Sequence, residues 1–366
     1  MAPRYTKLVE SLPSTVPFVG PETQERAKGS GFATRLGANE NVFGPSPKAI
    51  AAMQDVVPEV WMYGDPENYD LKQALAAFHG IPPENIVVGA GIDGLLGYLC
   101  RMLVGEGTPV VTSLGAYPTF NFHVAGYGGT LHTVPYVDDA EDPLALLDKA
   151  NEVDAALMYF ANPDNPMGTW HGAETVQDMI DNVPAGAVLC LDEAYVEFAP
   201  SGTAPALDVE NPNVIRMRTF SKGYGMAGAR VGYAIGHAGL IDAFNKVRNH
   251  FEMNRASQAG ALAALGDQQY LAQTVADVNE AKVRIGKIVV QYGFTPIPSA
   301  TNFLTIDCGH DGDYAHSLVA ALIAQNIFVR MPFVAPQDRC IRVSAGRPQD
   351  IGLFEAALPL ALEALK

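Results

Sequence analysis

Residues 219–233 read Thr-Phe-Ser-Lys-Gly-Tyr-Gly-Met-Ala-Gly-Ala-Arg-Val-Gly-Tyr. Lys222 stands among small residues in this stretch, so no bulky neighbour along the chain screens its amine. A planar aldehyde can reach that amine, and a phosphate can rest between Ser221 and Arg230. These are the groups that hold pyridoxal phosphate as a Schiff base. The stretch alone leaves open a surface lysine in a glycine-rich loop, because short motifs often match by chance.

The composition bounds the class of protein. The chain has 366 residues, of which 48% are hydrophobic, so it can form one large domain or two modest ones around a buried core. The formal net charge of −16 disfavours nucleic acid and anionic membranes as partners, because both attract basic surfaces. The four cysteines are scattered without a C-x-x-C pair, which predicts free thiols in a reducing compartment, the cytoplasm. No signal peptide and no membrane span are expected.

Short apolar runs alternate with helical stretches through the middle of the chain. Runs that end in turn residues or polar residues cover 86–88, 109–112, 155–160, 187–191 and 214–218. Fully apolar strands separated by helices predict an α/β fold with a mostly parallel sheet covered on both faces. Asp93, Asn165, Asp192 and Lys222 follow four of these runs. Because ligands bind beyond the carboxyl ends of such strands, we expect the four side chains at one site.

The pattern changes after about residue 235, where helical stretches and then short strands predict a smaller α+β domain. We expect a large cofactor-binding domain over 46–265 and a small C-terminal domain over 266–366. Residues 1–45 are rich in proline and glycine and predict an N-terminal arm that contributes to the small domain.

The predicted cofactor needs a carboxylate at its pyridine nitrogen, because the protonated ring acts as the electron sink. Asp192 ends an apolar run and suits this role, although an aspartate at a helix N-cap is the alternative. Tyr195 follows three residues later and can reach the phenolic oxygen of the cofactor. Asn165 can donate to the same oxygen, or it is a plain turn residue before a proline.

The phosphate of the cofactor needs donors. Gly91, Ile92 and Asp93 open a predicted helix after a strand, where backbone amides and the helix dipole bind anions. Phe120 can stack on the pyridine ring. The alternative, nearly as well supported, is that Phe120 is an ordinary core residue.

Several motifs in order resemble one family. They are Asn-Pro-Asp-Asn-Pro-Met-Gly (162–168), Asp-Glu-Ala-Tyr-Val-Glu-Phe (192–198), the Ser-Lys stretch with its arginine, Ala-Asn-Glu-Asn (38–41), Thr-Asn-Phe (301–303) and Ile-Arg-Val (341–343). The chain resembles the fold-type I, pyridoxal phosphate-dependent aminotransferases of class I and II, and within them the histidinol-phosphate aminotransferase group. The resemblance covers nearly the whole length.

The resemblance implies a role for each site residue. Lys222 binds the cofactor and moves the proton, Asp192 pairs with the ring nitrogen, and Tyr195 and Asn165 bind the phenolic oxygen. The phosphate is implied to contact Ile92 and Asp93 through their backbone, Ser221, Arg230 and Tyr63 of the neighbouring subunit of a homodimer. Substrate contacts are implied for Asn39, for Arg342 at the α-carboxylate and for Arg330 at a substrate phosphate. Arg330 in a surface ion pair is the alternative.

The chain also departs from the family pattern. Met167 replaces a threonine, Ile92-Asp93-Gly94 replaces Ser/Ala-Asp-Glu, Phe120 replaces a stacking tyrosine, and Phe18 replaces an aromatic hydroxyl near the N-terminus. Glu252 near a phosphate would repel it, or Arg255 would instead offset that repulsion, and the sequence leaves open which of the two side chains faces inward.

The resemblance implies a biosynthetic aminotransferase with ping-pong kinetics, acting on an amino acid or an amino phosphate such as histidinol phosphate and on a 2-oxoacid. A decarboxylase of the threonine-phosphate type is the alternative, because it shares the fold and most of the motifs. The remote alternative is a cofactor-binding effector domain without turnover, as in some transcription regulators. The net charge of −16 disfavours it, because DNA-binding proteins are basic.

Overall fold

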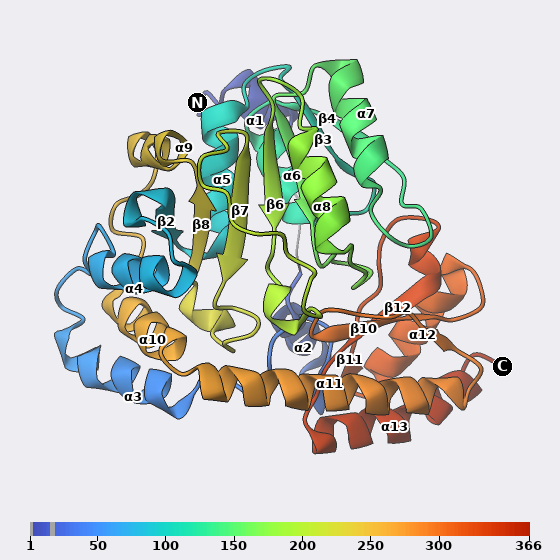
Figure 1. The fold of residues 1–366 in the computed structure, drawn as a ribbon. Coiled ribbons are helices and arrows are strands. Elements are labelled where there is room, and N and C mark those ends of the chain that lie inside the picture. Colours follow the sequence, from blue (N-terminus) through green and yellow to red (C-terminus); the bar gives the residue numbers. More distant parts are fainter. Residues whose placement is uncertain (1–2, 15–18) are drawn as a thin grey trace.

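The computed structural model describes residues 3–14 and 19–366, so Phe18 lies outside the described residues. Its centre is a seven-stranded sheet of order β2-β8-β7-β6-β5-β3-β4 (Figure 1). The strands are β2 (Ile86–Gly89), β3 (Pro109–Ser113), β4 (Thr130–Val134), β5 (Leu157–Ala161), β6 (Val188–Asp192), β7 (Val214–Thr219) and β8 (Gly232–Gly236). Strands β4, β3, β5, β6 and β7 run parallel, and β8 is antiparallel to both β7 and β2. The predicted mostly parallel sheet is therefore present.

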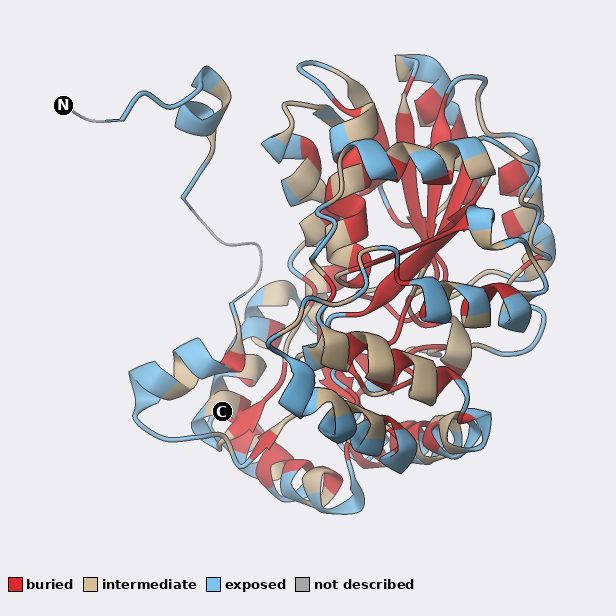
Figure 2. Cartoon of the chain, turned by 90° about the vertical axis from the view of Figure 1, so that its left-hand side faces the viewer, coloured by how far each residue is buried: buried red, intermediate tan, exposed pale blue. Residues whose placement is uncertain are grey.

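Alternate residues of the strands face opposite sides of the sheet, as the period of a strand requires. On one side Tyr159 and Cys190 pack with α5 and α6, and on the other Phe160 and Leu191 pack with α7 and α8. Figure 2 shows the strands buried between helices whose outer faces are exposed. The helices of this part are α3 (Pro47–Val56), α4 (Tyr69–His79), α5 (Gly91–Leu103), α6 (Pro118–Gly126), α7 (Pro143–Val153), α8 (Ala173–Asp181), α9 (Ala238–Ala243) and α10 (Arg255–Leu265).

The C-terminal part has its own core around a three-stranded sheet of order β12-β10-β9. Its elements are α11 (Gln268–Val290), β9 (Thr295–Pro296), β10 (Phe303–Asp307), α12 (Gly312–Ala324), β11 (Ile327–Phe328), β12 (Cys340–Ser344) and α13 (Pro348–Glu363). The long helix α11 begins beside the core of the large sheet at Leu271 and ends in the C-terminal core at Val289 (Figure 1). Short 3-10 helices are η1 (Val57–Glu59), η2 (Pro83–Asn85), η3 (Val196–Phe198), η4 (Ala227–Ala229), η5 (Phe244–Lys246) and η6 (Gln337–Arg339).

The N-terminal segment joins the C-terminal part. After α1 (Lys7–Ser11) and α2 (Pro21–Lys28), strand β1 (Thr34–Arg35) pairs in parallel with β11, and Leu36 is fully buried in the C-terminal core. The division of the chain at residues 45 and 265 stays a prediction.

Two strands of the large sheet were not predicted from the sequence. β4 is at the edge of the sheet, where exposed and polar residues mask its pattern. β8 begins and ends in glycine, which weakens a strand signal. Gly232 has a packing reason, because a Cβ at this position would lie 2.8 Å from the backbone nitrogen of Ile92. The backbone of β8 therefore supports the loop that opens helix α5.

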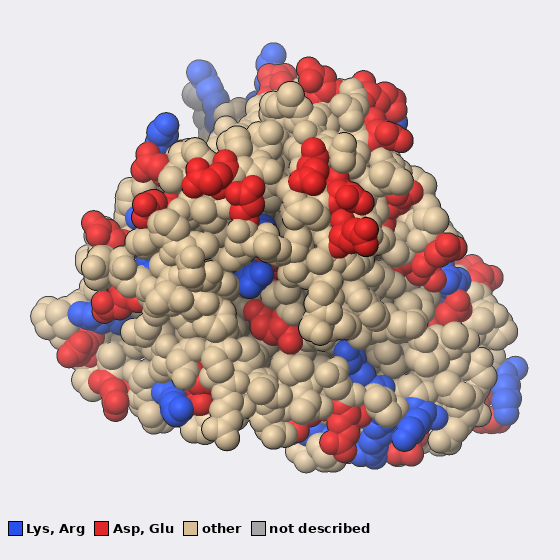
Figure 3. All heavy atoms as spheres, in the orientation of Figure 1, with Lys and Arg blue, Asp and Glu red and all other residues tan. Residues whose placement is uncertain are grey.

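Acidic side chains are spread over the upper part of the face in Figure 3. Among the described residues, no helix combines the length and the apolar content that a membrane span requires.

Candidate active site

The predicted site residues follow neighbouring strands at the carboxyl edge of the large sheet. β6 ends at Asp192, and β7 ends at Thr219, just before Ser221 and Lys222. The loop with Asn165 follows β5, and β5, β6 and β7 are adjacent in the sheet. The parallel strand order thus brings together residues that are far apart in the sequence.

The amine of Lys222 is held by the N-terminal segment. Its Nζ donates to the carbonyl oxygen of Asn39 at 3.0 Å and lies 5.4 Å from the centre of the Tyr195 ring. Asn39 also donates from Nδ2 to the Tyr195 hydroxyl at 3.1 Å. Asn302 donates to the Asn39 carbonyl at 3.0 Å. Asn39 is in the left-handed region with φ 53°, a conformation that asparagine tolerates better than most residues. Lys222 is half-buried, and its amine lies beside the ring of Tyr195.

Asp192 is buried, with 5% of its surface exposed. Its Oδ1 accepts the backbone N–H of Ala194 at 2.9 Å, and its Oδ2 accepts the hydroxyl of Tyr159 at 2.7 Å. Burial raises its pKa to about 6, so the carboxyl is mostly ionised at neutral pH. A buried anion of this kind is suited to pair with a cation such as a protonated pyridine nitrogen.

The start of helix α5 is the predicted position of the phosphate. Ala90 stands at the N-cap and provides no side-chain cap, so the first amides of the helix are left for another acceptor. Arg230 lies beside them, with Nη1 3.4 Å from the Ser221 hydroxyl and Nη2 3.8 Å from Asp93. A Cβ at Gly91 would lie only 2.3 Å from Nη2 of Arg230. Glycine at 91 therefore makes room for the guanidinium, and the donors fit the phosphate of the predicted cofactor.

Phe120 lies in the core, which is the alternative to a residue that stacks on the cofactor. Its side chain has no exposed surface and stacks on Tyr159, with ring centroids 4.6 Å apart. Tyr117 is the half-buried aromatic residue on the same segment, and its hydroxyl donates to Asp93 at 2.7 Å. Burial raises the pKa of Tyr117 well above its ordinary value, and the charge of Asp192 adds to the shift. We propose Tyr117 as the stacking residue, and its place directly before the helix of Phe120 was the signal in the sequence.

Two arginines from the C-terminal part complete the site. Arg342 donates from Nη1 to the side-chain oxygen of Asn165 at 2.5 Å, and its guanidinium lies 5.1 Å from the centre of the Phe303 ring. Arg330 is opposite it on a short ladder, with backbone hydrogen bonds in both directions. Arg330 also donates to the carbonyl oxygen of Val19. Burial, and to a smaller extent the charge of Arg342, lower the pKa of Arg330 to about 10.

Tyr63 is outside this group of residues within the protomer. It is 78% exposed and packs on Phe251, with ring centroids 4.7 Å apart.

Glu252 turns inward, where its Oε2 accepts the Tyr98 hydroxyl at 2.9 Å and its Oε1 would lie 3.0 Å from a Cβ at Gly89. Burial raises the pKa of Glu252. Arg255 does not offset this charge, because it faces Glu59 at 4.0 Å.

A pair of buried carboxyl groups lies behind the loop of Asn165. Asp164 accepts the hydroxyl of Tyr136 at 2.9 Å, and Glu141 accepts the hydroxyl of Ser113 at 2.6 Å. The two carboxyl groups influence each other's pKa. Burial raises the pKa of both groups, that of Asp164 to about 7. The pair therefore retains a proton near neutral pH. The sequence analysis did not identify it, because Glu141 comes from a separate loop.

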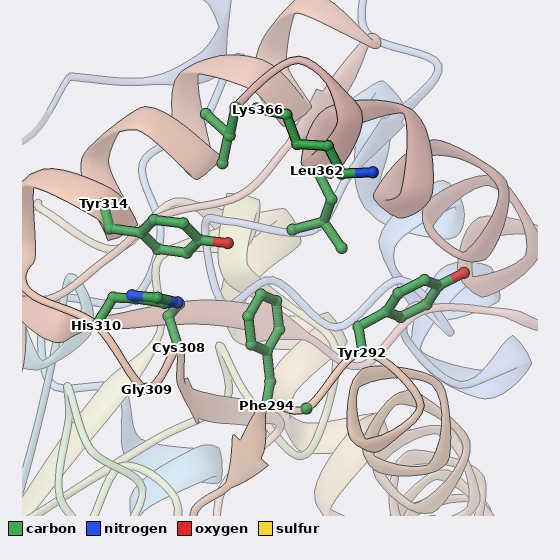
Figure 4. A pocket seen from close by; sticks show the side chains of 10 residues that line it. Tyr292, Phe294, Cys308, Gly309, His310, Tyr314, Leu362 and Lys366 are labelled. Carbon is green, nitrogen blue, oxygen red and sulfur yellow. The ribbon is translucent and has the colours of Figure 1, made fainter.

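A cavity of about 370 Å³ lies elsewhere, in the C-terminal part (Figure 4). His310 stacks on Tyr314 at its wall, with ring centroids 4.1 Å apart, and Phe294 projects toward its centre. Its remaining lining residues are Tyr292, Gly293, Cys308, Gly309, Leu362, Leu365 and Lys366. The cavity includes none of the predicted site residues.

The comparisons with known proteins identify the family of the chain. The family model "Aminotransferase class I and II" matches residues 33–353. Histidinol-phosphate aminotransferase 2 of Carboxydothermus hydrogenoformans is 33% identical over 366 residues, 98% of this chain and 99% of that protein. The crystal structure of histidinol-phosphate aminotransferase from Sinorhizobium meliloti in complex with pyridoxal-5'-phosphate is 50% identical, with a TM-score of 0.97 over 100% of this chain and 99% of that one. Aspartate aminotransferase from Thermus thermophilus, at 18% identity and a TM-score of 0.81, covers 100% of this chain and 99% of that one and shares the fold.

Proposed function

The chain belongs to the class I and II aminotransferases, with the fold-type I architecture of that family, and we propose that it moves an amino group between histidinol phosphate and a 2-oxoacid. It is a pyridoxal phosphate-dependent enzyme. When bound, the cofactor withdraws electrons from the α-carbon of the substrate, so that a proton can leave it. All other steps depend on the residues of the chain.

We assign each residue of the site a task. Lys222 carries the proton at the α-carbon, since its amine is the movable base of the site. Asp192 holds the ring nitrogen as a cation, and Asn165 and Tyr195 donate to the phenolic oxygen. The two substrates use this one site in turn, which gives ping-pong kinetics.

The buried guanidinium of Arg342 is the observation that carries the proposal. Within residues 3–14 and 19–366, its Nε has no hydrogen-bond partner, and burial lowers its pKa. Its Nη1 donates to the neutral side chain of Asn165, so the buried cation has no charged hydrogen-bond partner among the described residues and is suited to an anion of the substrate. Arg330 beside it adds a second positive charge. The pair fits the phosphate of an amino phosphate in one half-reaction and the carboxylates of an oxoacid in the other.

The half-reactions test the substrate. We expect histidinol phosphate to convert the bound cofactor to its amine form, seen as loss of the visible absorption band, and a 2-oxoacid to restore the band. Histidinol without the phosphate is the matched control and should react far more slowly. Equal rates for the two compounds would contradict a phosphate-binding role of Arg330.

The same experiment separates the alternative reaction. Release of carbon dioxide from threonine phosphate, without restoration of the band by an oxoacid, would instead support a decarboxylase. Replacement of Lys222 by alanine should abolish the visible band and turnover. Wild-type turnover in that variant would overturn the assignment of the lysine.

We also propose a homodimer. Trp61 is 81% exposed and Tyr63 78%, and Phe251 beside them is 53% exposed. A contiguous group of exposed aromatic side chains marks a protein interface, and Tyr63 would then reach the phosphate of the neighbouring site. Sedimentation analysis should give twice the chain mass, and Trp61→Glu should shift it toward the monomer. A wild-type monomer that binds the cofactor tightly would contradict the shared site.

We place the reaction in amino-acid biosynthesis in the cytoplasm. The four cysteines are free and buried, which suits a reducing compartment. Cell fractionation tests the compartment, and growth of a deletion strain with and without histidine tests the pathway.

A further inference from the structure

The anion of Asp192 is held by donors from within the protein. Its two oxygens accept the N–H of Ala194 at 2.9 Å and the hydroxyl of Tyr159 at 2.7 Å. Only 5% of Asp192 and 1% of Tyr159 is exposed. Because the pair is buried, water cannot readily replace the phenol as a donor.

The orientation of the Tyr159 hydroxyl is fixed by the packing of its strand and its ring. Tyr159 is in β5, where it pairs in register with Cys190 of β6. Asp192 is two residues further along β6, so it faces the same side of the sheet as Cys190 and Tyr159. The ring of Tyr159 stacks on Phe120 at 4.6 Å with an interplanar angle of 20°. The hydroxyl is therefore fixed on one carboxylate oxygen.

We propose that Tyr159 is a positioning residue of the aminotransferase reaction, which keeps the Asp192 carboxylate ionised and aimed at the ring nitrogen of the cofactor. The inference rests on the proposed function, since it requires pyridoxal phosphate with its ring nitrogen at Asp192. Tyr159 acts through Asp192 and is not a catalytic residue.

The charges around Asp192 show why a donor is needed. Burial raises its pKa, and the anions Asp93 and Glu193 raise it further, whereas the hydrogen bonds from Tyr159 and Ala194 lower it. The titratable groups that influence this carboxyl or are influenced by it are Asp93 of α5, Tyr117 before α6, Glu141 before α7, Tyr159 of β5, and Cys190 and Glu193 beside it on the chain. The side-chain hydrogen bond from Tyr159 lowers the pKa of Asp192, against the effects of burial, Asp93 and Glu193. Burial also raises the pKa of Tyr159, so it stays a protonated donor.

A double-mutant cycle tests the inference. Tyr159→Phe removes the hydroxyl and keeps the ring on Phe120. The affinity of the apoenzyme for pyridoxal phosphate is measured in the wild type, in Tyr159→Phe, in Asp192→Asn and in the double variant. Tyr136→Phe is the matched control, because it removes another buried phenol from another buried carboxylate, Asp164.

We expect Tyr159→Phe to weaken cofactor binding about tenfold, the effect of one hydrogen bond to a buried charge. In the Asp192→Asn background the same change should have no more than about a twofold effect. The control should lose stability and keep its cofactor affinity. Equal effects of Tyr159→Phe in both backgrounds, or no effect in either, would overturn the inference. Failure of the wild type to bind pyridoxal phosphate would instead overturn the proposed function.

The pH profile of kcat gives a second measurement. Without the phenol, Asp192 should take up a proton more readily, so the acidic limb should move to higher pH in Tyr159→Phe and stay in place in Tyr136→Phe. If Tyr159→Phe does not fold, 3-fluorotyrosine at position 159 is the second variant. Its more acidic phenol is a stronger donor and should move the acidic limb to lower pH. An unchanged limb would contradict the role of Tyr159.

Discussion

The glycine at the start of helix α5 offers the sharpest test of the anion site. Gly91 has φ 80°, and a Cβ there would lie 2.3 Å from Nη2 of Arg230. Gly91→Ala therefore has two separate effects. The left-handed backbone costs about 1–2 kcal/mol for any other residue, and the methyl group must displace the guanidinium of Arg230 from its present position.

The second effect determines cofactor binding. A hydrogen bond to a charged group contributes about 1.5–3 kcal/mol. Loss of the contact between Arg230 and the phosphate should therefore weaken the affinity for pyridoxal phosphate about tenfold to 150-fold, since 1.4 kcal/mol is a factor of ten. The assay is titration of the apoenzyme with the cofactor, followed by the visible absorption band.

Gly186→Ala is the matched control. Gly186 has φ 88° and nothing within 4 Å of the position of a Cβ, so the variant has the backbone strain without the collision. Urea denaturation should show a similar loss of stability in both variants, about 1–2 kcal/mol. The reasoning is refuted if Gly91→Ala binds the cofactor as tightly as Gly186→Ala does.

Three further outcomes are expected. Tyr117→Leu should weaken cofactor binding with little loss of stability, whereas Phe120→Leu should lower the denaturation midpoint and largely spare binding, and the reverse pattern would restore Phe120 as the stacking residue. Arg342→Lys should lower kcat/KM for the 2-oxoacid about tenfold or more, because an ammonium cannot replace a bidentate fork, and unchanged steady-state kinetics would contradict its role. The carboxyl of Asp164 has a pKa raised from 3.8 to about 7, so folding takes up a proton, and the stability this provides is lost as the pH rises from about 4 to 7. Burial also raises the pKa of Glu141, so Glu141→Gln removes one of the two groups and should reduce the total loss. Urea denaturation at several pH values measures it, and an unchanged slope would show that Glu141 does not contribute.

The sequence was sufficient for the family and the fold class. Apolar runs ended by Asp192 and by the stretch with Lys222 predict parallel strands with functional groups at their ends, because a strand buried on both faces must be apolar throughout. The order of the motifs predicted the aminotransferase family, and the comparisons confirm this prediction. The tasks assigned to individual residues stay proposals.

The tertiary structure alone decided which side chains meet. Phe120 and Tyr117 are equally aromatic in the sequence, and only the packing of α6 buries Phe120 and leaves Tyr117 half-buried.

The same holds for the partners of the two carboxyl groups. Tyr159 meets Asp192 because β5 and β6 are in register, and Asp164 meets Glu141 because a distant loop returns to the sheet. Local patterns determine the type of element, since propensity and periodicity act over a few residues. Contacts between distant residues depend on register and on side-chain packing, which no short stretch of sequence contains.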